Sequence, residues 1–167
     1  MRTQTIQVLN HASSPQTIGT LPPFSPVQTE SARNVLRLAQ EEVQRFQHEY
    51  VGTEHLLLAL IRERDGIAAQ VLTNLGVELE KLRIAVEVIS WHGNHPGGEV
   101  PLNQRAKEVL EQAMFEARHL NHNYLSTEHL LLGLTRVEES FAAAALQSTG
   151  INMQQVRTAV IEALNQP

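Results

Sequence analysis

The chain has 167 residues and a formal net charge of -5, with 42% hydrophobic residues, 4% aromatic residues and no cysteine. The lack of cysteine excludes disulfides, thiol catalysis and cysteine-ligated zinc. The acidic balance, without a long basic run, gives no indication of a nucleic-acid surface. No apolar run approaches the roughly 20 residues that cross a bilayer, so we expect neither a nucleic acid nor a membrane as a partner.

The first 23 residues form a polar segment rich in Ser, Thr and Gln, with three prolines. This composition predicts a flexible N-terminal extension at 1–23, and the apolar stretch of a secretory signal is missing. One arginine and no acidic residue leave an organellar transit peptide as the alternative. We therefore expect a cytoplasmic protein, or a plastid stromal protein if this segment is a transit peptide.

Residues 28–90 are repeated as residues 102–164, with an offset of 74 positions and no gap. Of the 63 aligned positions 22 are identical, where chance would give only a handful. An internal duplication of this kind predicts two structurally related units. Between them, the stretch SWHGNHPGGEVP is typical of a loop because of its glycines and prolines. We expect one folded domain at 24–167, divided into a first repeat at 24–91, a linker at 92–100 and a second repeat at 101–165.

The apolar spacing predicts four helices in each repeat. The first follows Thr29 as its cap, and the second begins after Thr53 and is apolar on most of its circumference, as a buried central helix would be. A short third helix ends with Gly76 as its C′ residue, and a fourth follows. The predicted fold class is all-α, with two four-helix repeats related by a pseudo-twofold axis and packed against each other. In the second repeat the helices are expected at about 103–120, 127–137, 140–149 and 152–164.

Each repeat carries Thr-Glu-His directly before a leucine run. The simplest interpretation is a helix start, in which the threonine caps a free backbone N–H and the glutamate, at the first helical position, interacts favourably with the helix dipole. The other interpretation is a binding site with two poles. The N–H groups of a helix start bind anions, and a carboxylate beside them binds a guanidinium. The candidate ligand-binding residues are Thr53, Glu54, Thr127 and Glu128.

Catalytic and metal-binding signals are weak. Four histidines recur in register: His48, His55, His122 and His129. We expect them to make structural hydrogen bonds, because buried polar side chains are normally paired. Glu42 and Glu116 are expected to be solvated on polar helix faces. No metal-binding spacing, phosphate loop, G-x-S-x-G turn or H-E-x-x-H motif is present, so we expect no catalytic residue, no metal and no cofactor.

Two stretches resemble the two repeats of the Clp amino-terminal domain: ARNVLRLAQEEVQRFQHEYVGTEHLLLALIRERDGIAAQVLTNLGV and RAKEVLEQAMFEARHLNHNYLSTEHLLLGL. This domain caps the Clp-type AAA+ unfoldases, and the resemblance covers roughly residues 24–165. It implies an all-helical double repeat that recruits substrates or adaptor proteins to a Clp ATPase and its protease. In C-type members the glutamate of the motif is associated with phosphoarginine binding, which implies Thr53-Glu54 and Thr127-Glu128 here.

The second copy departs from the family pattern at two places. Ser126 stands where the family motif GTEH has its glycine, so we expect a narrower second pocket. The turn Glu138-Glu139-Ser140 replaces the family's Gly-Glu-Gly, and we expect its additional acid to disfavour a phosphate at the second site. No ATPase motif follows the repeats, so the resemblance implies binding rather than unfolding activity.

The leading hypothesis is a non-enzymatic interaction module of the Clp chaperone–protease system. Its expected partners are Clp ATPase or Clp protease subunits, adaptors or tagged substrate proteins. A second hypothesis is a protein that senses or sequesters a peptide or small molecule and so shields a Clp unfoldase. An enzyme is the least favoured class, because its only support is eight histidines and several acids.

Overall fold

The computed structural model describes residues 26–166, so the extension predicted at 1–23 lies outside the described residues. The described part contains eight helices and two strands of two residues each, which confirms the all-α fold class. No helix in this part is long and apolar enough to cross a membrane. The elements are β1 (Val27–Gln28), α3 (Glu30–Phe46), α4 (Thr53–Arg62), α5 (Ile67–Asn74), α6 (Leu79–Ser90), α7 (Gln104–His119), β2 (Tyr124–Leu125), α8 (Thr127–Thr135), α9 (Phe141–Ser148) and α10 (Met153–Leu164).

Local signals in the sequence explain several helix ends. The Thr29 hydroxyl accepts a hydrogen bond from the Ala32 N–H and caps α3, as predicted. Gly76 follows α5 with a φ of 90°, a conformation that favours glycine. The N–H groups of Gly76 and Val77 then bond back to the last turn of α5 as a Schellman motif. The C′ role predicted for Gly76 is therefore confirmed.

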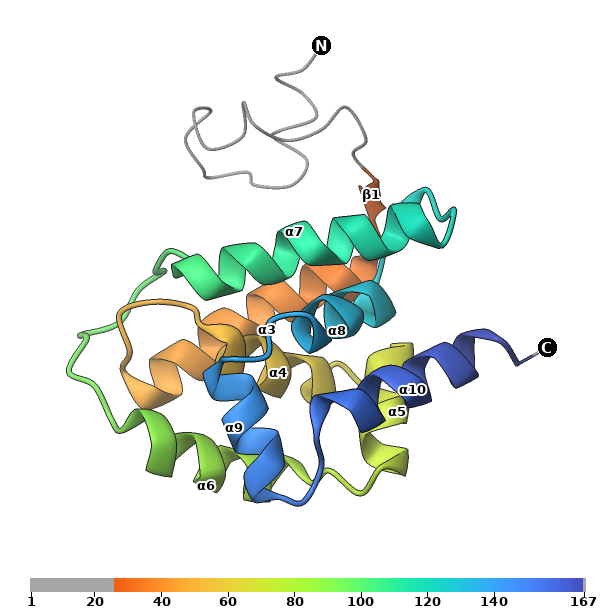
Figure 1. Cartoon of the computed structure of the whole chain (residues 1–167). Coiled ribbons are helices and arrows are strands. Elements are labelled where there is room, and N and C mark those ends of the chain that lie inside the picture. The colour runs from red at the N-terminus through yellow and green to blue at the C-terminus, as the bar shows by residue number, and fades with distance from the viewer. Residues whose placement is uncertain (1–25, 167) are drawn as a thin grey trace, which may run out of the picture.

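The two repeats interleave instead of forming separate lobes. Within each repeat the first helix packs on the second, α3 on α4 and α7 on α8. The third and fourth helices also pack across the repeats, because α6 of the first packs on α9 of the second, and α10 of the second packs on α5 of the first. Figure 1 shows α3 and α7 above the central helices, with the four short helices α5, α6, α9 and α10 below.

The centre of the domain is made by the two leucine helices. Every residue of α8 is buried, and so is every residue of α4 except Arg62. This agrees with the expectation that an all-round apolar helix lies in the core. Charged and polar side chains at the starts of α4 and α8 are consequently buried too, and they require partners.

Short parallel pairings tie the repeats together above the core. Strand β1 pairs with β2, with Gln28 beside Leu125. The pseudo-symmetric counterpart is an isolated bridge between Val51 and Leu102. These pairings place the start of α3 beside the start of α8, and the start of α7 beside the start of α4. The candidate site lies where these helix starts meet.

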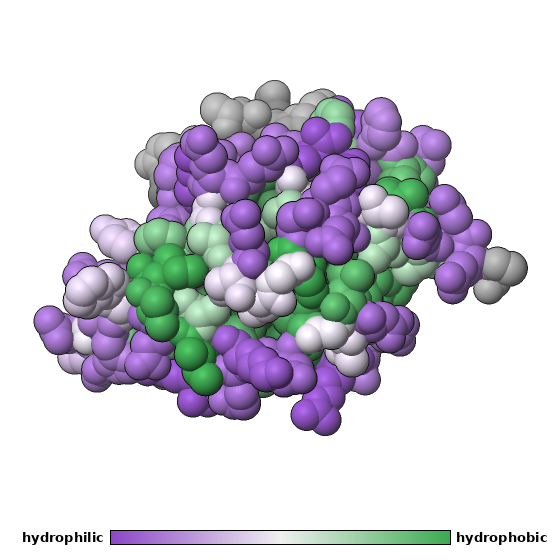
Figure 2. All heavy atoms as spheres, turned by 60° about the horizontal axis from the view of Figure 1, so that its bottom comes forward, coloured by the Kyte–Doolittle hydropathy of each residue, from purple (hydrophilic) through white to green (hydrophobic). Residues whose placement is uncertain are grey.

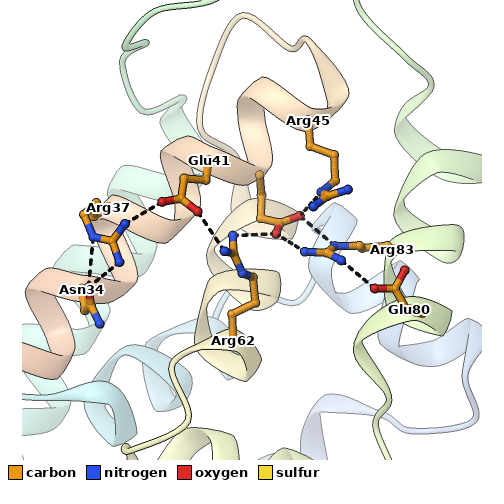
Figure 3. Close-up of polar contacts among 8 residues, drawn as sticks. Asn34, Arg37, Glu41, Arg45, Arg62, Glu80 and Arg83 are labelled. Atoms are coloured by element: carbon orange, nitrogen blue, oxygen red, sulfur yellow. Dashed lines mark hydrogen bonds and ion pairs between the residues drawn. The ribbon is translucent and has the colours of Figure 1, made fainter.

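Glu42 and Glu116 are not solvated, so the prediction made for them is wrong. Both side chains are nearly fully buried. Glu42 accepts hydrogen bonds from Arg62 at 2.9 Å and from Arg83 at 2.7 Å. Figure 3 shows the side chains of Arg62 and Arg83 lying close together, Arg62 from α4 and Arg83 from α6. Each helix carries the glutamate on a face that is polar in sequence, but the arginines of two neighbouring helices close over it.

The second repeat contains the equivalent cluster, in which Arg136 and Arg157 bond to Glu116. Burial alone would raise the pKa of Glu116, but the hydrogen bonds and charges of the two arginines outweigh it and hold that pKa below its usual range. The two clusters therefore join three helices in each repeat through charged hydrogen bonds.

Candidate functional site

The threonines of the two Thr-Glu-His motifs do not cap their own helices. Gly52 is the N-cap of α4, so Thr53 is the first helical residue and Glu54 the second. The Thr53 hydroxyl instead accepts a hydrogen bond of 3.1 Å from the Ala142 N–H at the start of α9. The prediction that Thr53 caps its own helix was wrong. A threonine hydroxyl can accept a hydrogen bond from the free N–H groups at the start of any nearby helix, and here that helix is α9.

The second threonine makes the reciprocal contact. Thr127 Oγ1 accepts a hydrogen bond of 3.2 Å from the Ala68 N–H at the start of α5. Gly66, the N-cap of α5, has no side chain that could do this, and a Cβ at this position would come within 2.7 Å of Thr127 Cγ2. Glycine at position 66 is thus needed for the close approach of the other repeat.

The histidine of each motif pairs with a histidine seven residues before it, and these hydrogen bonds confirm the predicted structural role. The Gly52 N–H donates to His55 Nδ1 at 2.8 Å, and His55 Nε2 lies 2.8 Å from His48 Nδ1. Since Nδ1 of His55 accepts, its Nε2 carries the proton and donates to His48. His48 Nε2 in turn donates to the Trp91 carbonyl at 2.6 Å. The second repeat has the same chain of bonds from the Ser126 N–H through His129 to His122.

Burial keeps the imidazoles of His55 and His129 neutral. Burial, with a smaller contribution from His48, lowers the pKa of His55 to about 3. Burial and His122 lower the pKa of His129 to about 4 against the opposing charge of Glu116. Ligand atoms of His48, Glu54 and His55 do lie within 4.8 Å of one another. However, both nitrogens of neutral His55 are engaged in hydrogen bonds, so it has no free lone pair for a metal.

Glu54 lies in a pocket of about 400 Å³ between the repeats. Its side chain is buried, and burial raises its pKa to about 7 against a hydrogen bond from its own backbone N–H. The carboxylate folds back over Gly52, where a Cβ would lie 3.0 Å from Glu54 Cδ and would overlap the carboxylate oxygen. The pocket is lined by Thr53, Glu54, Asn103, Arg105, Glu139, Ser140 and Phe141.

Most of the pocket wall comes from the second repeat, which the sequence interpretation did not foresee. Asn103 caps α7, Arg105 lies in its first turn, and Phe141 begins α9 with its ring about half exposed. The offset of 74 residues aligns equivalent positions, but it does not show that the third helix of one repeat crosses to the second helix of the other. The pocket therefore combines the buried carboxyl group of Glu54, the guanidinium of Arg105 and the aromatic ring of Phe141.

The packing of each third helix against the other repeat also changes which site the acidic turn belongs to. The acidic turn was expected to weaken the site at Glu128, but Glu139 lines the pocket at Glu54. The turn that begins α5 contains Asp65 and Gly66, and this turn contacts Thr127. Each turn thus belongs to the site of the other repeat.

The site at Glu128 differs in its neighbours. Ser126 accepts a hydrogen bond of 3.0 Å from the Thr29 hydroxyl, so its side chain occupies the space beside the first helix start. Position 31, which corresponds to Arg105, is a serine. Burial, together with the charge of Glu128, raises the pKa of Tyr124. Glu128 is as buried as Glu54 but lacks the cation at the position of Arg105.

The comparisons with known proteins agree with this fold. The family described as the Clp repeat (R) N-terminal domain matches residues 28–136 and 101–167. A protein of Guillardia theta, described as ATP-dependent Clp protease ATP-binding subunit ClpA homolog, is 50% identical over 137 residues, which are 81% of this chain and 17% of that protein. The chloroplastic chaperone protein ClpC1 of Oryza sativa subsp. japonica is 49% identical over 134 residues, which are 80% of this chain and 15% of that protein. The chain thus spans about one sixth of the length of these relatives.

Solved structures show the same architecture. The N-terminal domain of the chaperone ClpD from Arabidopsis thaliana matches with a TM-score of 0.72 and 26% identity, covering 88% of this chain and 99% of that domain. The N-terminal domain of Hsp104 from Candida albicans matches with a TM-score of 0.68, covering 83% of this chain and 92% of that one. Its identity is 18%, so it supports the fold alone.

Proposed function

The chain belongs to the Clp repeat N-terminal domain family, and we propose that it is a non-enzymatic interaction module of the Clp chaperone–protease system. Its partners are Clp ATPase or Clp protease subunits, adaptors, or substrate proteins that carry a tag. The compartment we propose is the cytoplasm or the plastid stroma, and the chloroplastic relatives support the second. The part of the chain that the structure describes offers binding groups in a pocket but no nucleophile paired with a base.

One observation carries the finer proposal, which is recognition of phosphoarginine. A buried carboxylate, Glu54, and a guanidinium, Arg105, line the same pocket. Glu54 provides the acceptor for the guanidinium of the ligand, and Arg105 provides a donor for its phosphate. A ligand with only one of these charges would leave one pole unmatched.

The raised pKa of Glu54 suits this role. With a pKa of about 7 the empty site holds a carboxyl group that is close to half protonated at neutral pH. A guanidinium within about 4–6 Å favours the ionised form, so ligand binding releases a proton and tightens as the pH rises. Glu139 opposes the phosphate, so its removal should strengthen binding at this pocket.

A capture experiment tests the proposal. We would immobilise the wild-type protein, Glu54→Ala, Glu128→Ala and the matched variant Glu139→Ala, and offer one substrate protein with and without phosphorylated arginines. We expect retention of the phosphorylated form, a loss of at least tenfold with Glu54→Ala, and stronger retention with Glu139→Ala. Equal retention of both forms would refute phosphoarginine recognition.

The broader proposal needs its own arm of the experiment. Purified C-type Clp ATPase and Clp protease subunits are offered to the same wild-type surface, with bovine serum albumin as the negative control. Binding of either subunit supports an interaction module of this system. Failure of both subunits and both substrate forms to bind would refute it.

A further inference from the structure

An apolar ridge of three side chains runs along the solvent side of α6. Ile84, Val88 and Trp91 are 64%, 73% and 76% exposed. Their spacing of four and three residues places them on one face of the helix, opposite the buried Leu82 and Val86. Figure 2 shows hydrophobic residues gathered on the side of the molecule where α6 lies in Figure 1. We call these three residues the α6 ridge.

The duplication provides an internal control for the ridge. Helix α10 is the counterpart of α6, with the same length and the same place in its repeat. At the three equivalent positions it carries Thr158, Glu162 and Asn165, all of which are exposed. The same helix therefore folds with polar residues on this face, and the apolar character of the ridge is not a requirement of packing.

The backbone of Trp91 is strained as well. Its φ of 64° and ψ of 174° lie in a region that is essentially restricted to glycine and costs on the order of 1–3 kcal/mol. Bonds hold the residue there, from its N–H to the Glu87 carbonyl at 3.0 Å and from His48 to its own carbonyl. The equivalent Asn165 has an ordinary φ of -89°. The fold thus keeps a large indole in solvent in a conformation that favours a much smaller residue.

The charges beside the ridge indicate what can cover it. Lys81, on one margin, is neutralised by Glu78 at 3.2 Å. Glu87, on the other margin, has no ion-pair partner among residues 26–166 of the structure. It lies one turn from Ile84 and one turn from Trp91, so an apolar partner with a basic margin would complement it.

The exposed area argues against a second copy as the occupant. Three side chains of this size and exposure present roughly 400 Å² of apolar surface. Two ridges in contact would bury about 800 Å², below the roughly 1,200 Å² of a stable specific interface. A partner that also covers the margins of α6 would bury more, as amphipathic helices do when they pack side by side.

We propose that the α6 ridge is a docking surface for an amphipathic helix with a basic margin on a partner protein. The ridge contributes none of the residues that line the Glu54 pocket, so this site is independent of the proposed ligand site. Trp91 is the single tryptophan of the chain, and it therefore reports on the ridge without a label.

Trp91 fluorescence tests the proposal with three synthetic peptides. The first is an amphipathic helix with leucines at i, i+3, i+4 and i+7 and lysines on its margins. The second replaces the lysines with glutamates, and the third replaces the leucines with serines. We expect a saturable blue shift of Trp91 emission with the first peptide, at least tenfold weaker binding of the second, and none of the third.

Two variants make the result specific to the ridge. Ile84→Thr with Val88→Glu installs the residues of α10, keeps Trp91 and should weaken binding of the first peptide at least tenfold. Glu87→Gln should weaken it severalfold. Circular dichroism of each variant checks that the fold is retained.

Other occupants would overturn the proposal. A blue shift that grows with protein concentration alone, together with a dimer in sedimentation, would identify a second copy. A shift with phosphatidylcholine vesicles but with none of the peptides would identify a lipid surface. No shift with any of the peptides would refute helix docking at this ridge.

Discussion

The Thr53 hydroxyl and the Ala142 N–H form a 3.1 Å hydrogen bond that joins the leucine helix of one repeat to the third helix of the other. Thr127 and Ala68 form the reciprocal bond at 3.2 Å. The threonine of each Thr-Glu-His motif, predicted to cap its own helix, thus caps the third helix of the other repeat. We call these two hydrogen bonds the crossed caps. Each repeat therefore provides the acceptor for a buried backbone N–H of the other, and buried donors of this kind need a partner. A single repeat of this size would also be marginally stable by itself.

Removal of one crossed cap should destabilise the whole domain. We expect Thr53→Val, which keeps the shape but removes the acceptor, to lower the free energy of unfolding by about 1–2 kcal/mol, the range for losing a cap. Thr53→Ser keeps the hydroxyl and should cost less. Urea denaturation followed by circular dichroism measures both. A larger loss for Thr53→Ser than for Thr53→Val would show that packing of the methyl group, which valine retains, outweighs the hydrogen bond.

Glu54 should make the domain less stable at high pH. Its pKa is about 7 in the folded protein and 4.5 in the unfolded chain. The folded state therefore binds the proton more tightly, and stability falls as the pH rises from about 4.5 to 7. At 1.36 kcal/mol per pKa unit the loss is about 3 kcal/mol. Glu54→Gln should remove it, so that the variant is more stable than wild type at pH 8 and similar to it at pH 4. Greater stability of wild type at pH 8 would contradict this.

His55 and His129 should make the folded domain less stable at low pH. Their pKa values of about 3 and about 4 lie below the value of 6.5 for an unfolded histidine. The unfolded state therefore takes up protons first, and stability falls as the pH drops from about 6.5 toward 3. Long-range nitrogen–proton NMR spectra should show both rings as neutral Nε2–H tautomers at pH 5.5. Imidazolium signals for them at that pH in the folded protein would contradict the hydrogen-bond chain.

The buried glutamate clusters should matter more than the surface ion pairs around them. Glu42→Gln removes a charge that two arginines surround, and breaking such a buried pair typically costs about 3–5 kcal/mol. Glu41 also bonds to Arg62, at 2.8 Å, but its side chain is 46% exposed. Glu41→Gln should therefore cost less than about 1 kcal/mol. Thermal unfolding of both variants provides the comparison, and similar losses would show that Glu42 is effectively solvated.

The fold was accessible from the sequence because the duplication and the helical periodicity point to the same elements. Thr29 and Gly76 mark their helix ends by local chemistry that needs no tertiary contact. The resemblance to the Clp domain then indicated the pairing of the repeats, and the structural neighbours agree with it.

The site was only partly accessible. Glu54 and Glu128 were identified, but Arg105, Asn103 and Phe141 were not. Asn103 and Arg105 reach the pocket through the pairing of Val51 with Leu102, and Phe141 reaches it because α9 packs on α4. Glu42 was misjudged for a related reason. One helical wheel shows a polar face, whereas the arginines that cover it come from α4 and α6.

The most direct test of the central claim is calorimetric titration of the protein with free phosphoarginine, with arginine and inorganic phosphate as controls. We predict saturable binding of phosphoarginine that tightens between pH 6 and pH 8, much weaker binding of either control, and at least tenfold weakening by both Glu54→Ala and Arg105→Ala. The loss with Glu128→Ala should be smaller. Binding that is unchanged by Glu54→Ala, or no heat of binding with phosphoarginine at any pH in this range, would contradict the proposed two-pole site.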